Sequence, residues 1–502
     1  MEKLLKLQNG SDIRGVAIST DKQDAMLTGE AVSAIAIGLV NWLRQKTEKS
    51  HFKIGVGRDS RLSGPKLKKI FCETLVDYGC EVIDFGLATT PALFMSTQFE
   101  AFSCDASVML TASHLPYEYN GVKIFSKDGG AEKEDIRFIL THSQKEDSLT
   151  KGKLAQADLL TPYANHLVNK ISRKKVETPL SNMKIIVDAG NGAGGFFAEK
   201  VLQPLGADTS GSQFLEPDGH FPNHVPNPDN KEAMASIQKQ TLATGADLGI
   251  IFDTDVDRAA VVTKTGEILN RNNLIAVLSQ IVLSEHPGTS IVTNSPTSDH
   301  LKAFIEAKGG HQVRYISGYR NVINKAISLN EQGIDCQLAI ETSGHAAFKE
   351  NYFLDDGAYV IAKILMLLPQ LQEKGESLDH LIADLKQPEE TQEVRFFLDE
   401  ENFRGLGEKV IQDLAKWPVK GWIVDRENEE GVRFKTSTPF GTGWFLLRLS
   451  LHEPLLVLQV EMDESGKIRQ VLEKIHLFLK TYPTVDQKKL EILLNEIESG
   501  KN

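Results

Sequence analysis

A serine, a histidine and a lysine lie close together in one short stretch of the chain. Ser113 and His114 follow an apolar run at 106–110, and Lys123 precedes a second apolar pair at 124–125. Proline and glycine punctuate the residues between, which predicts a tight loop between two strands. A hydroxyl beside an imidazole, with a cation nearby, suits a nucleophile that carries a phosphoryl group. The alternative is a surface turn whose serine bonds to local backbone.

Three alternating carboxylates form a second group that could do chemistry. Asp253, Asp255 and Asp257 directly follow an apolar run at 247–252, which predicts a buried strand. In an extended chain they would project to one side and offer hard oxygen ligands to one divalent cation. An EF-hand does not fit, because its sixth position requires glycine and is Arg258 here. Few protein oxygens favour Mg²⁺ beside a phosphate over a caged Ca²⁺, and a solvated acidic turn is the alternative.

Arginines on three predicted turns could bind anions. Arg14 lies in a polar loop between two glycines, and Arg320 follows a Ser-Gly-Tyr run before a predicted helix. Arg448 begins a predicted strand-to-strand turn that also carries Ser450 and His452. The planar guanidinium fork matches the oxygens of a phosphate, and a helix N-terminus attracts anions. Ion pairs with surface carboxylates and ordinary polar turns are the alternatives.

A further polar group follows the predicted strand at 337–340. Glu341, Ser343 and His345 offer a carboxylate, a hydroxyl and an imidazole at alternate positions of one loop. Such groups can bind sugar hydroxyls through hydrogen bonds. They could equally be a helix cap followed by a structural histidine.

A glycine-rich string at 190–195 formally has the G-x-G-x-x-G spacing of a dinucleotide site. Asp208 stands roughly where a ribose-binding carboxylate could fall, but it follows a predicted helix without an apolar strand before it. The preferred interpretation is therefore a tight strand-to-helix turn that needs glycine.

Strands and helices alternate along most of the chain, which predicts α/β domains with mixed, largely parallel sheets. Predicted helices include 29–46, 65–78, 160–170 and 231–241, and predicted strands include 53–57, 81–85, 106–110 and 290–293. The passage from strand through polar turn to helix recurs, so three related α/β units are expected. Charged sequence at 373–393 predicts a linker around one short helix, and residues 394–502 predict an α+β module with an antiparallel sheet.

The composition is that of a soluble globular protein with several domains. The chain has 502 residues, of which 41% are apolar and 25% charged, and this length predicts roughly three or four domains. The net charge of −12 disfavours nucleic acid and membrane surfaces as partners but permits a local basic pocket for anions. The sequence has no apolar leader and no run of the ~18 apolar residues that a spanning helix needs. Four cysteines without metal-type spacing predict buried thiols in a reducing cytoplasm.

Taken together and in order, these motifs resemble those of the α-D-phosphohexomutases, the superfamily of phosphoglucomutases and phosphomannomutases. The matching motifs are Ser-Asp-Ile-Arg-Gly at 11–15, Gly-Arg-Asp-Ser-Arg at 57–61, Thr-Ala-Ser-His at 111–114, Asn-Gly-Val-Lys at 120–123, the aspartate loop at 253–258, Glu-x-Ser-Gly-His at 341–345 and a degenerate phosphate loop at 448–454. The resemblance implies three related α/β domains and a C-terminal α+β, TBP-like domain around a central cleft. The implied domains are 1–158 with the phosphoserine loop, 159–270 with the metal loop, 271–385 with the sugar-binding loop and 386–502 with the phosphate-binding loop.

The resemblance also implies roles at the reaction centre. Ser113 is the expected phosphorylated nucleophile, and one Mg²⁺ per chain is expected on the three aspartates and on the phosphoserine. Arg14, His114 and Lys123 would surround the transferring phosphoryl group and move protons, while Arg258 would neutralise charge. Phosphoryl transfer needs mainly positioning and positive charge around the equatorial oxygens, which these groups would supply.

Small-molecule sugar phosphates are the partners that the resemblance implies. The implied substrate-binding residues are Glu341, Ser343, His345 and Arg320, and the implied phosphate-binding residues are Arg448, Ser450 and His452. A separate phosphate clamp is expected because a sugar 1,6-bisphosphate must turn over within the cleft between the two transfers.

Three loops depart from the family pattern. Leu115 replaces the usual asparagine of the serine loop, and Thr254 and Val256 replace small residues between the metal ligands. The largest departure is at 448–454, which lacks the glycine and threonine of the usual R-P-S-G/N-T-E-P. The variant loops are similar to those of a plant and cyanobacterial branch, some of whose members resemble glucose-1,6-bisphosphate synthases.

The expected protein is a cytoplasmic phosphohexomutase, an isomerase of carbohydrate metabolism. It would interconvert hexose 1-phosphate and hexose 6-phosphate, with glucose the favoured hexose, through a phosphoserine and a sugar 1,6-bisphosphate. The alternatives are a glucose-1,6-bisphosphate synthase with a donor such as fructose 1,6-bisphosphate, and a non-catalytic sugar-phosphate sensor. Glucose 1,6-bisphosphate could also serve as an activator, and the sequence predicts no oligomeric state.

Overall fold

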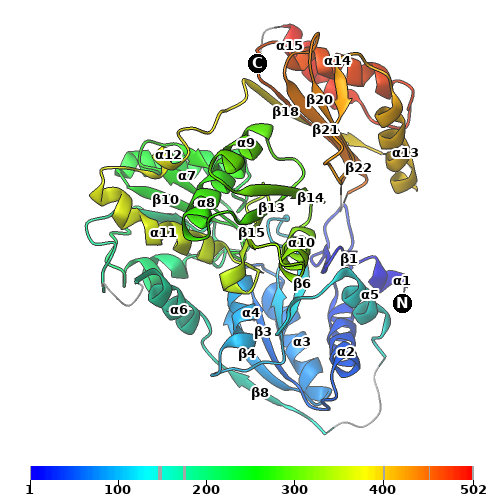
Figure 1. Ribbon diagram of the computed structural model, residues 1–502. Coiled ribbons are helices and arrows are strands. Elements are labelled where there is room, and N and C mark those ends of the chain that lie inside the picture. Colours follow the sequence, from blue (N-terminus) through cyan, green and yellow to red (C-terminus); the bar gives the residue numbers. More distant parts are fainter. Residues whose placement is uncertain (1, 145–149, 173–176, 399–401, 451–452, 500–502) are drawn as a thin grey trace. The chain divides into compact units, whose positions relative to one another are not determined.

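The computed structural model describes residues 2–144, 150–172, 177–398, 402–450 and 453–499 (Figure 1). The chain forms two compact units, Met1–Glu285 with Gln337–Ala383, and His286–Cys336 with Asp384–Asn502. The expected division into four domains stays a prediction. Within the part of the chain that the structure describes, no helix is both long and apolar enough to cross a membrane.

The first sheet of the first unit has eight strands, coloured blue to cyan in Figure 1. They are β1 (Gln8–Asn9), β2 (Asp12–Val16), β3 (Lys53–Arg58), β4 (Glu81–Leu87), β5 (Ala106–Leu110), β6 (Tyr119–Ser126), β7 (Gly129–Gly130) and β8 (Lys153–Gln156). The order is β1-β2-β6-β5-β3-β4-β8, with β7 on β6. β3 is parallel to β4 and β5, and β6 is antiparallel to β5, so Leu110 faces Val122. The loop that carries Ser113 therefore leaves the carboxyl end of an inner strand, where such sheets bind ligands.

Helices pack on both faces of this sheet. They are α1 (Glu2–Leu5), α2 (Gly29–Lys46), α3 (Gly64–Asp77), α4 (Thr90–Gln98) and α5 (Lys133–Thr141). α2, α3 and α5 share one apolar core with Ile54 and Val56 of β3, whereas alternate residues of β3 face α4. α2 begins where predicted, because Thr28 accepts a hydrogen bond from the amide of Ala31 and so caps the helix. The predictions of helix 29–46 and strand 106–110 are confirmed at both ends.

The second sheet has four strands in the order β12-β11-β10-β9. They are β9 (Ile185–Asp188), β10 (Leu248–Phe252), β11 (Ala259–Thr263) and β12 (Ile268–Leu269), and the nearby helices are α6 (Leu160–Ser172), the π-helix η1 (Ala198–Leu202) and α7 (Lys231–Thr244). β10 is parallel to β9 and antiparallel to β11, with Phe252 opposite Ala259. The aspartates therefore occupy the turn of a hairpin at the carboxyl end of β10.

The remainder of the first unit supplies a short antiparallel ladder and its helices. These elements are α8 (Arg271–Glu285), β15 (Cys336–Ile340), β16 (Ala346–Phe348), η2 (Lys349–Asn351), β17 (Leu354–Asp355), α11 (Gly357–Glu373) and α12 (Leu378–Leu381). β15 pairs with β16, and β16 with β17. Asp356 caps α11 by accepting a hydrogen bond from the amide of Tyr359 at 2.8 Å.

The second unit contains a parallel strand pair and an antiparallel sheet. The pair is β13 (Ser290–Asn294) and β14 (His311–Tyr315), with α9 (Asp299–Ala307) and α10 (Tyr319–Glu331). The sheet has the order β18 (Glu390–Phe397), β22 (Leu455–Met462), β21 (Gly443–Leu449), β20 (Val432–Thr436) and β19 (Trp422–Val424). Apolar side chains of α13 (Phe403–Lys416), α14 (Ile468–Leu479) and α15 (Lys488–Glu498) complete its core.

The α/β class with mixed sheets is confirmed, and the linker prediction needs one correction. The predicted linker was to run to Glu393, but β18 begins at Glu390 and pairs with β22 along its whole length. The charged residues misled the prediction because β18 is an edge strand whose alternate side chains face solvent. All four cysteines are buried thiols, as expected.

Candidate active site

Ser113 lies on a sharp turn immediately beyond β5. Its backbone is left-handed, with a φ of 51°, and its side chain is buried. This conformation is uncommon for a residue other than glycine and marks a constrained position. The amide of Ser113 donates to Thr111 Oγ1 at 2.9 Å, and its Oγ donates to Asp253 Oδ2 at 2.9 Å. The turn thus aims the hydroxyl at the first aspartate of the second sheet.

Arg61 fixes the serine loop. Its guanidinium donates to four backbone carbonyls of that loop, those of Ser113, Leu115, Pro116 and Tyr119. Its Nε lies 3.3 Å from Asp59 Oδ2, which also accepts a hydrogen bond from Thr111 Oγ1 at 2.7 Å. Arg61 and Asp59 are fully buried, and this burial raises the pKa of Asp59 to about 6 although Arg61 opposes the shift. The conformation of the loop therefore depends on one buried ion pair.

The three aspartates lie on a tight turn, so the expectation of an extended chain is wrong. Val256, between the second and third, has a φ of 67°. The turn, rather than strand alternation, brings carboxylate oxygens of Asp253, Asp255 and Asp257 within 4.8 Å of one another. A positive φ is costly for a β-branched residue, and the amide of Gly357 helps to hold it by donating to Val256 O at 3.0 Å.

The glycine-rich string at 190–195 packs against this turn. The amide of Ala193 donates to Thr254 O at 2.8 Å. A Cβ on Gly192 would lie only 2.6 Å from that oxygen and 2.7 Å from Thr254 Cα. The string is thus a turn between β9 and the following helical segment, and the close approach of the metal loop is what requires glycine at 192.

The donor set of the turn fits a divalent cation. Lys123 Nζ bonds to Asp257 Oδ2 and lies 3.1 Å from Asp255 Oδ2. Among the described residues, no protein group forms a hydrogen bond to Asp255 Oδ1 or Asp257 Oδ1, although both atoms are buried. Buried carboxylate oxygens require a partner, and hard oxygens in this number suit Mg²⁺. The three aspartates could therefore hold the metal that their spacing suggested.

Neighbouring charges separate the protonation states of the aspartates. Burial, and after it the charge of Asp257, raises the pKa of Asp253 well above its ordinary value. Burial opposes ionisation of Asp257 too, but Lys123 and His345 outweigh it and hold the pKa of Asp257 well below its ordinary value. Lys123 and His345 therefore favour the ionised form of Asp257, whereas burial and the charge of Asp257 favour the protonated form of Asp253.

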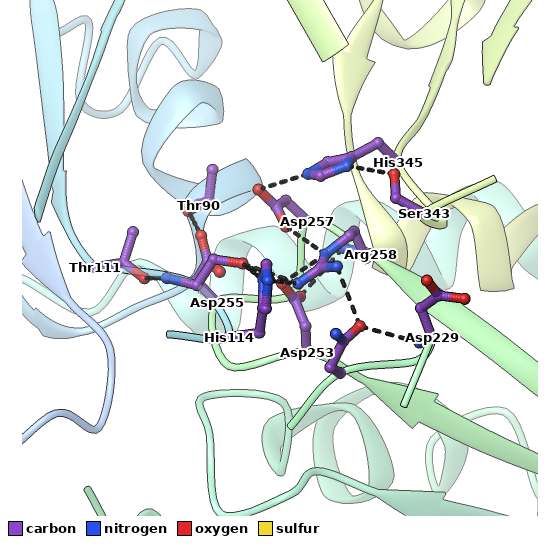
Figure 2. Close-up of polar contacts among 12 residues, drawn as sticks. Thr90, Thr111, His114, Asp229, Asp253, Asp255, Asp257, Arg258, Ser343 and His345 are labelled. Atoms are coloured by element: carbon purple, nitrogen blue, oxygen red, sulfur yellow. Dashed lines mark hydrogen bonds and ion pairs between the residues drawn. The ribbon is translucent and has the colours of Figure 1, made fainter. Parts of the chain in front are cut away.

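His114 and Arg258 meet at the serine hydroxyl. Figure 2 shows the two side chains together beside Asp253. Arg258 Nη2 donates to Ser113 Oγ at 3.0 Å and to His114 Nδ1 at 2.7 Å. His114 Nδ1 lies 3.4 Å from the same Oγ. Burial, Arg258 and Arg14 lower the pKa of His114 well below its ordinary value, so the imidazole is neutral at pH 7 with its proton on Nε2.

Arg14 lies on a strand, not on the loop expected from its flanking glycines. It belongs to β2 opposite Gly121 of β6, and its Nη2 donates to Asp12 Oδ2 at 2.8 Å. The pairing joins residues far apart in the chain, which a local glycine signal cannot indicate. The expected nearness of Arg14 to the serine loop survives this correction, since its charge acts on the pKa of His114.

The loop at 341–345 joins β15 to β16 and does not cap a helix, so that alternative is wrong. The Ser343 hydroxyl and His345 Nδ1 are 2.9 Å apart, and His345 Nε2 lies 3.7 Å from Asp257 Oδ2. The backbone of His345 also forms an isolated bridge with Arg258. Although burial opposes it, Asp257 raises the pKa of His345. The loop therefore borders the metal turn (Figure 2).

The remaining candidate residues belong to the second unit. Arg320 lies in the first turn of α10. Arg448, on β21, has its Nη1 3.7 Å from Glu430 Oε1, and Ser450 follows that strand. His452 lies outside the described residues. Their participation in one site with Ser113 stays a prediction.

Comparisons with known families agree with this geometry. Residues 5–150, 161–266 and 270–388 match the phosphoglucomutase/phosphomannomutase α/β/α domains I, II and III, respectively. The chain belongs to the phosphoglucomutase/phosphomannomutase family. The resemblance to the α-D-phosphohexomutases is thereby confirmed at the level of the superfamily.

Relatives in this family extend over nearly the whole chain. A phosphomannomutase/phosphoglucomutase of Pseudomonas putida is 33% identical over 464 residues, 92% of each chain. A phosphoglucomutase of Neisseria gonorrhoeae is 31% identical over 94% of this chain and 96% of its own. A crystal structure of a phosphoglucomutase/phosphomannomutase family protein from Burkholderia thailandensis has a TM-score of 0.78 at 26% identity, and covers 95% of this chain and 97% of that one.

Sequence reasoning missed three contacts of this candidate site. The hydrogen bonds of Arg61 to the serine loop were not foreseen. Thr90, the first residue of α4, donates from its hydroxyl to Asp255 Oδ2 and from its amide to Asp255 O at 2.9 Å. Asn227 accepts a hydrogen bond from Arg258 Nη1 at 3.2 Å. The Thr-Pro pair is a helix-start signal in the sequence, but nothing there indicates what the helix start would face.

Proposed function

We propose that this member of the phosphoglucomutase/phosphomannomutase family is a phosphohexomutase whose phosphoryl carrier is Ser113. A single observation supports the proposal: the buried Ser113 Oγ lies between a carboxylate of the metal turn, 2.9 Å away, and the Arg258 guanidinium, 3.0 Å away. An ordinary turn serine has no need of such an environment. Together these groups supply what a phosphoryl carrier needs, a nucleophilic oxygen and fixed positive charge.

Each transfer exchanges one P–O bond for another. When the phosphoserine donates, its P–Oγ bond breaks, a P–O bond to a sugar hydroxyl forms, and the hydroxyl loses its proton. Arg258 stabilises the negative charge that develops on Oγ. We assign the transfer of this proton to Arg14, His114 and Lys123 together. In this set Nδ1 of the neutral His114 is the unprotonated nitrogen and takes the proton when Arg258 Nη2 donates to the phosphoryl oxygens instead of to the imidazole. Mg²⁺ on Asp253, Asp255 and Asp257 would supply further charge neutralisation.

The second transfer starts from the sugar 1,6-bisphosphate turned end for end. We assign recognition of the sugar to Glu341, Ser343, His345 and Arg320, and recognition of the distal phosphate to Arg448, Ser450 and His452. Glucose phosphate is the favoured substrate, and glucose 1,6-bisphosphate the favoured activator. A net charge of −12 disfavours nucleic acid as a partner and permits a local basic site for small anions.

A second candidate function follows from the altered loop at 448–454. Without the glycine and threonine of the usual motif, the distal phosphate would be held less tightly and the bisphosphate could leave. The protein would then act as a glucose-1,6-bisphosphate synthase, the enzyme that some members of the plant and cyanobacterial branch with similar loops resemble. The intact serine, aspartates and Arg258 weigh against a non-catalytic sensor.

Domain boundaries and compartment belong to the same proposal. We place four domains at 1–158, 159–270, 271–385 and 386–502, and the protein in the cytoplasm, where sugar phosphates and reduced thiols occur together.

One assay separates the candidate functions. Glucose 1-phosphate and Mg²⁺ are incubated with the protein, with and without a bisphosphate donor, and glucose 6-phosphate and released glucose 1,6-bisphosphate are followed. Fast isomerisation with a catalytic trace of bisphosphate identifies the mutase, and stoichiometric bisphosphate with little isomerisation identifies the synthase. Ser113→Ala abolishes turnover in either case and removes the phosphate from the protein in mass spectra. Retained turnover would exclude Ser113 as the carrier.

A further inference from the structure

The irregular segment at 217–228, which precedes α7 and is hereafter the anchor segment, contacts both arginines that serve Ser113. We infer that the anchor segment is a positioning element for phosphoryl transfer. It orients the Arg258 guanidinium through Asn227, and through Phe221 it supports Arg61, the residue that holds the serine loop. The inference rests on the proposed function, since it names what holds the groups that act on Ser113.

Asn227 acts on the outer edge of the Arg258 guanidinium. Its Oδ1 accepts from Arg258 Nη1 at 3.2 Å, while Nη2 of the same group donates to Ser113 Oγ at 3.0 Å. Nε donates to Asp253 Oδ2 at 3.1 Å. A planar fork with its three nitrogens engaged has one orientation, so the Asn227 oxygen sets the angle at which Nη2 meets the serine. The same Oδ1 accepts from the amide of Asp229 at 3.0 Å, which fixes the Asn227 side chain in turn.

His224 fastens the anchor segment to the second sheet. Its Nε2 lies 3.1 and 3.0 Å from the two carboxylate oxygens of Asp188, the last residue of β9. Its Nδ1 lies 3.0 Å from Val225 O. His224 and Asp188 are buried. Both ring nitrogens thus have acceptors as partners, which only an imidazolium satisfies with two donors. Asn227 follows His224 by three positions, so the position of the Asn227 amide depends on the histidine.

Phe221 and Gly219 bring the other end of the anchor segment against Arg61 and its neighbours. The Arg61 guanidinium lies 5.3 Å from the centroid of the Phe221 ring, within the range of a cation–π contact. A Cβ on Gly219 would lie 2.5 Å from Ser60 O and 2.6 Å from the amide nitrogen of Leu62. The two backbones therefore touch, and one segment supports Arg61 and Arg258 at once.

The anchor segment offers a matched pair of histidines for the test. His220 is four residues from His224, exposed, and its ring contacts the Asp218 carboxylate at 2.8 Å. The measurement is the single-turnover rate of phosphoryl transfer from glucose 1,6-bisphosphate to Ser113, together with kcat and KM for glucose 1-phosphate. His224→Ala and Asn227→Ala are expected to lower the rate and kcat about tenfold, since small misplacements of a catalytic group have effects of this size, with KM nearly unchanged. His220→Ala is expected to match the wild type, and Asn227→Asp, which keeps the acceptor oxygen, to restore most of the rate.

A double-variant comparison distinguishes positioning from general destabilisation. In an Arg258→Ala background, Asn227→Ala is expected to cause no further loss, because its effect passes through the guanidinium. Full additivity of the two losses would overturn the inference, as would equal effects of His220→Ala and His224→Ala. If wild-type protein takes up no phosphate on Ser113, the proposed function itself fails. If the wild type is phosphorylated and Asn227→Ala is as fast, only the inference about the anchor segment fails.

Discussion

Arg61 satisfies four carbonyls and one carboxylate from a single side chain, which only a planar fork of donors can do. Arg61→Lys keeps the charge and loses the fork. We expect it to lower the free energy of unfolding by about 2–4 kcal/mol, because buried carbonyls lose their donor, and to lower kcat at least tenfold. Urea unfolding and steady-state turnover measure the two effects.

A nearby arginine provides the control for this substitution. Arg58, on β3, is partly buried, and its Nη1 donates to one backbone carbonyl, that of Asp59, at 2.8 Å. Arg58→Lys is expected to change stability by less than about 1 kcal/mol, the net worth of one hydrogen bond, and to leave kcat near the wild-type value. Similar losses in both variants would show that the serine loop does not depend on the Arg61 fork.

His224 makes stability depend on pH. Burial opposes its protonation, but the Asp188 carboxylate outweighs it and raises the pKa of His224 above the ordinary value. A histidine whose pKa is higher in the folded state contributes its full stabilisation at pH values below its pKa in the unfolded state, about 6.5. This stabilisation is lost as the pH rises through its pKa in the folded state. We expect the Tm advantage of the wild type over His224→Gln to shrink from about pH 6 to about pH 9. His220→Gln should follow the wild-type profile, and a constant advantage would contradict the protonated pair.

Residue types at the site were predictable, and their geometry was not. The aspartates were recognised because alternating carboxylates after a buried strand have few other uses. The extended conformation was wrong because Val256 adopts a positive φ, which the sequence of a β-branched residue argues against. That conformation depends on the contact with Gly357, about 100 residues away in the chain. Local propensity cannot anticipate a conformation that distant contacts impose.

At the scale of elements, the sequence predicted best where the signals are local. Helix α2 was predicted at both ends because its helical apolar pattern lies within its own residues, and the structure shows that Thr28 caps its start. β18 was predicted to begin too late because an edge strand tolerates charged residues on its solvated face. The strand position of Arg14 was missed because β2 is defined by its pairing with β6. Elements that are held by distant partners therefore escaped sequence reasoning.

Gly192 tests the contact between the glycine string and the metal turn. In Gly192→Ala the new Cβ would lie 2.7 Å from Thr254 Cα, so the turn must shift. We expect a loss of about 1–3 kcal/mol in stability, as for other overpacked sites, and a higher Mg²⁺ concentration for half-maximal turnover. The Mg²⁺ titration and thermal unfolding together give both values.

A second glycine of the same sheet region serves as control. Gly245 caps α7 with a φ of 64° and faces open space. Gly245→Ala is expected to cost about 1 kcal/mol through backbone strain and to leave the Mg²⁺ requirement unchanged. An unchanged Mg²⁺ requirement in Gly192→Ala would show that the contact of the glycine string does not affect metal binding by the turn.

At the scale of the whole molecule, the proposed functional groups are distributed over the two compact units. Groups assigned to phosphoryl transfer lie in the first unit, and the proposed phosphate clamp at Arg448 lies in the second. No residue pattern near Arg448 distinguishes a clamp from a polar turn, so its assignment rests on the order of motifs along the entire chain. The family matches at 5–150, 161–266 and 270–388 support that order as far as residue 388, and the Arg448 clamp beyond it stays a prediction.

The proposed phosphate clamp at Arg448 leads to a prediction about whether glucose 1,6-bisphosphate is retained or released. Replacing Leu451 by glycine and His452 by threonine restores the usual family residues at 451 and 452. If the altered loop weakens the hold on the distal phosphate, the double substitution should lower the release of glucose 1,6-bisphosphate relative to isomerisation by about tenfold, the worth of one good hydrogen bond to a charged group. The ratio of the two products in one reaction, measured with Arg448→Ala as the weakened reference, tests this. A ratio that is the same in wild type, restored loop and Arg448→Ala would show that the loop does not control retention, and control would then have to lie among the groups around Ser113.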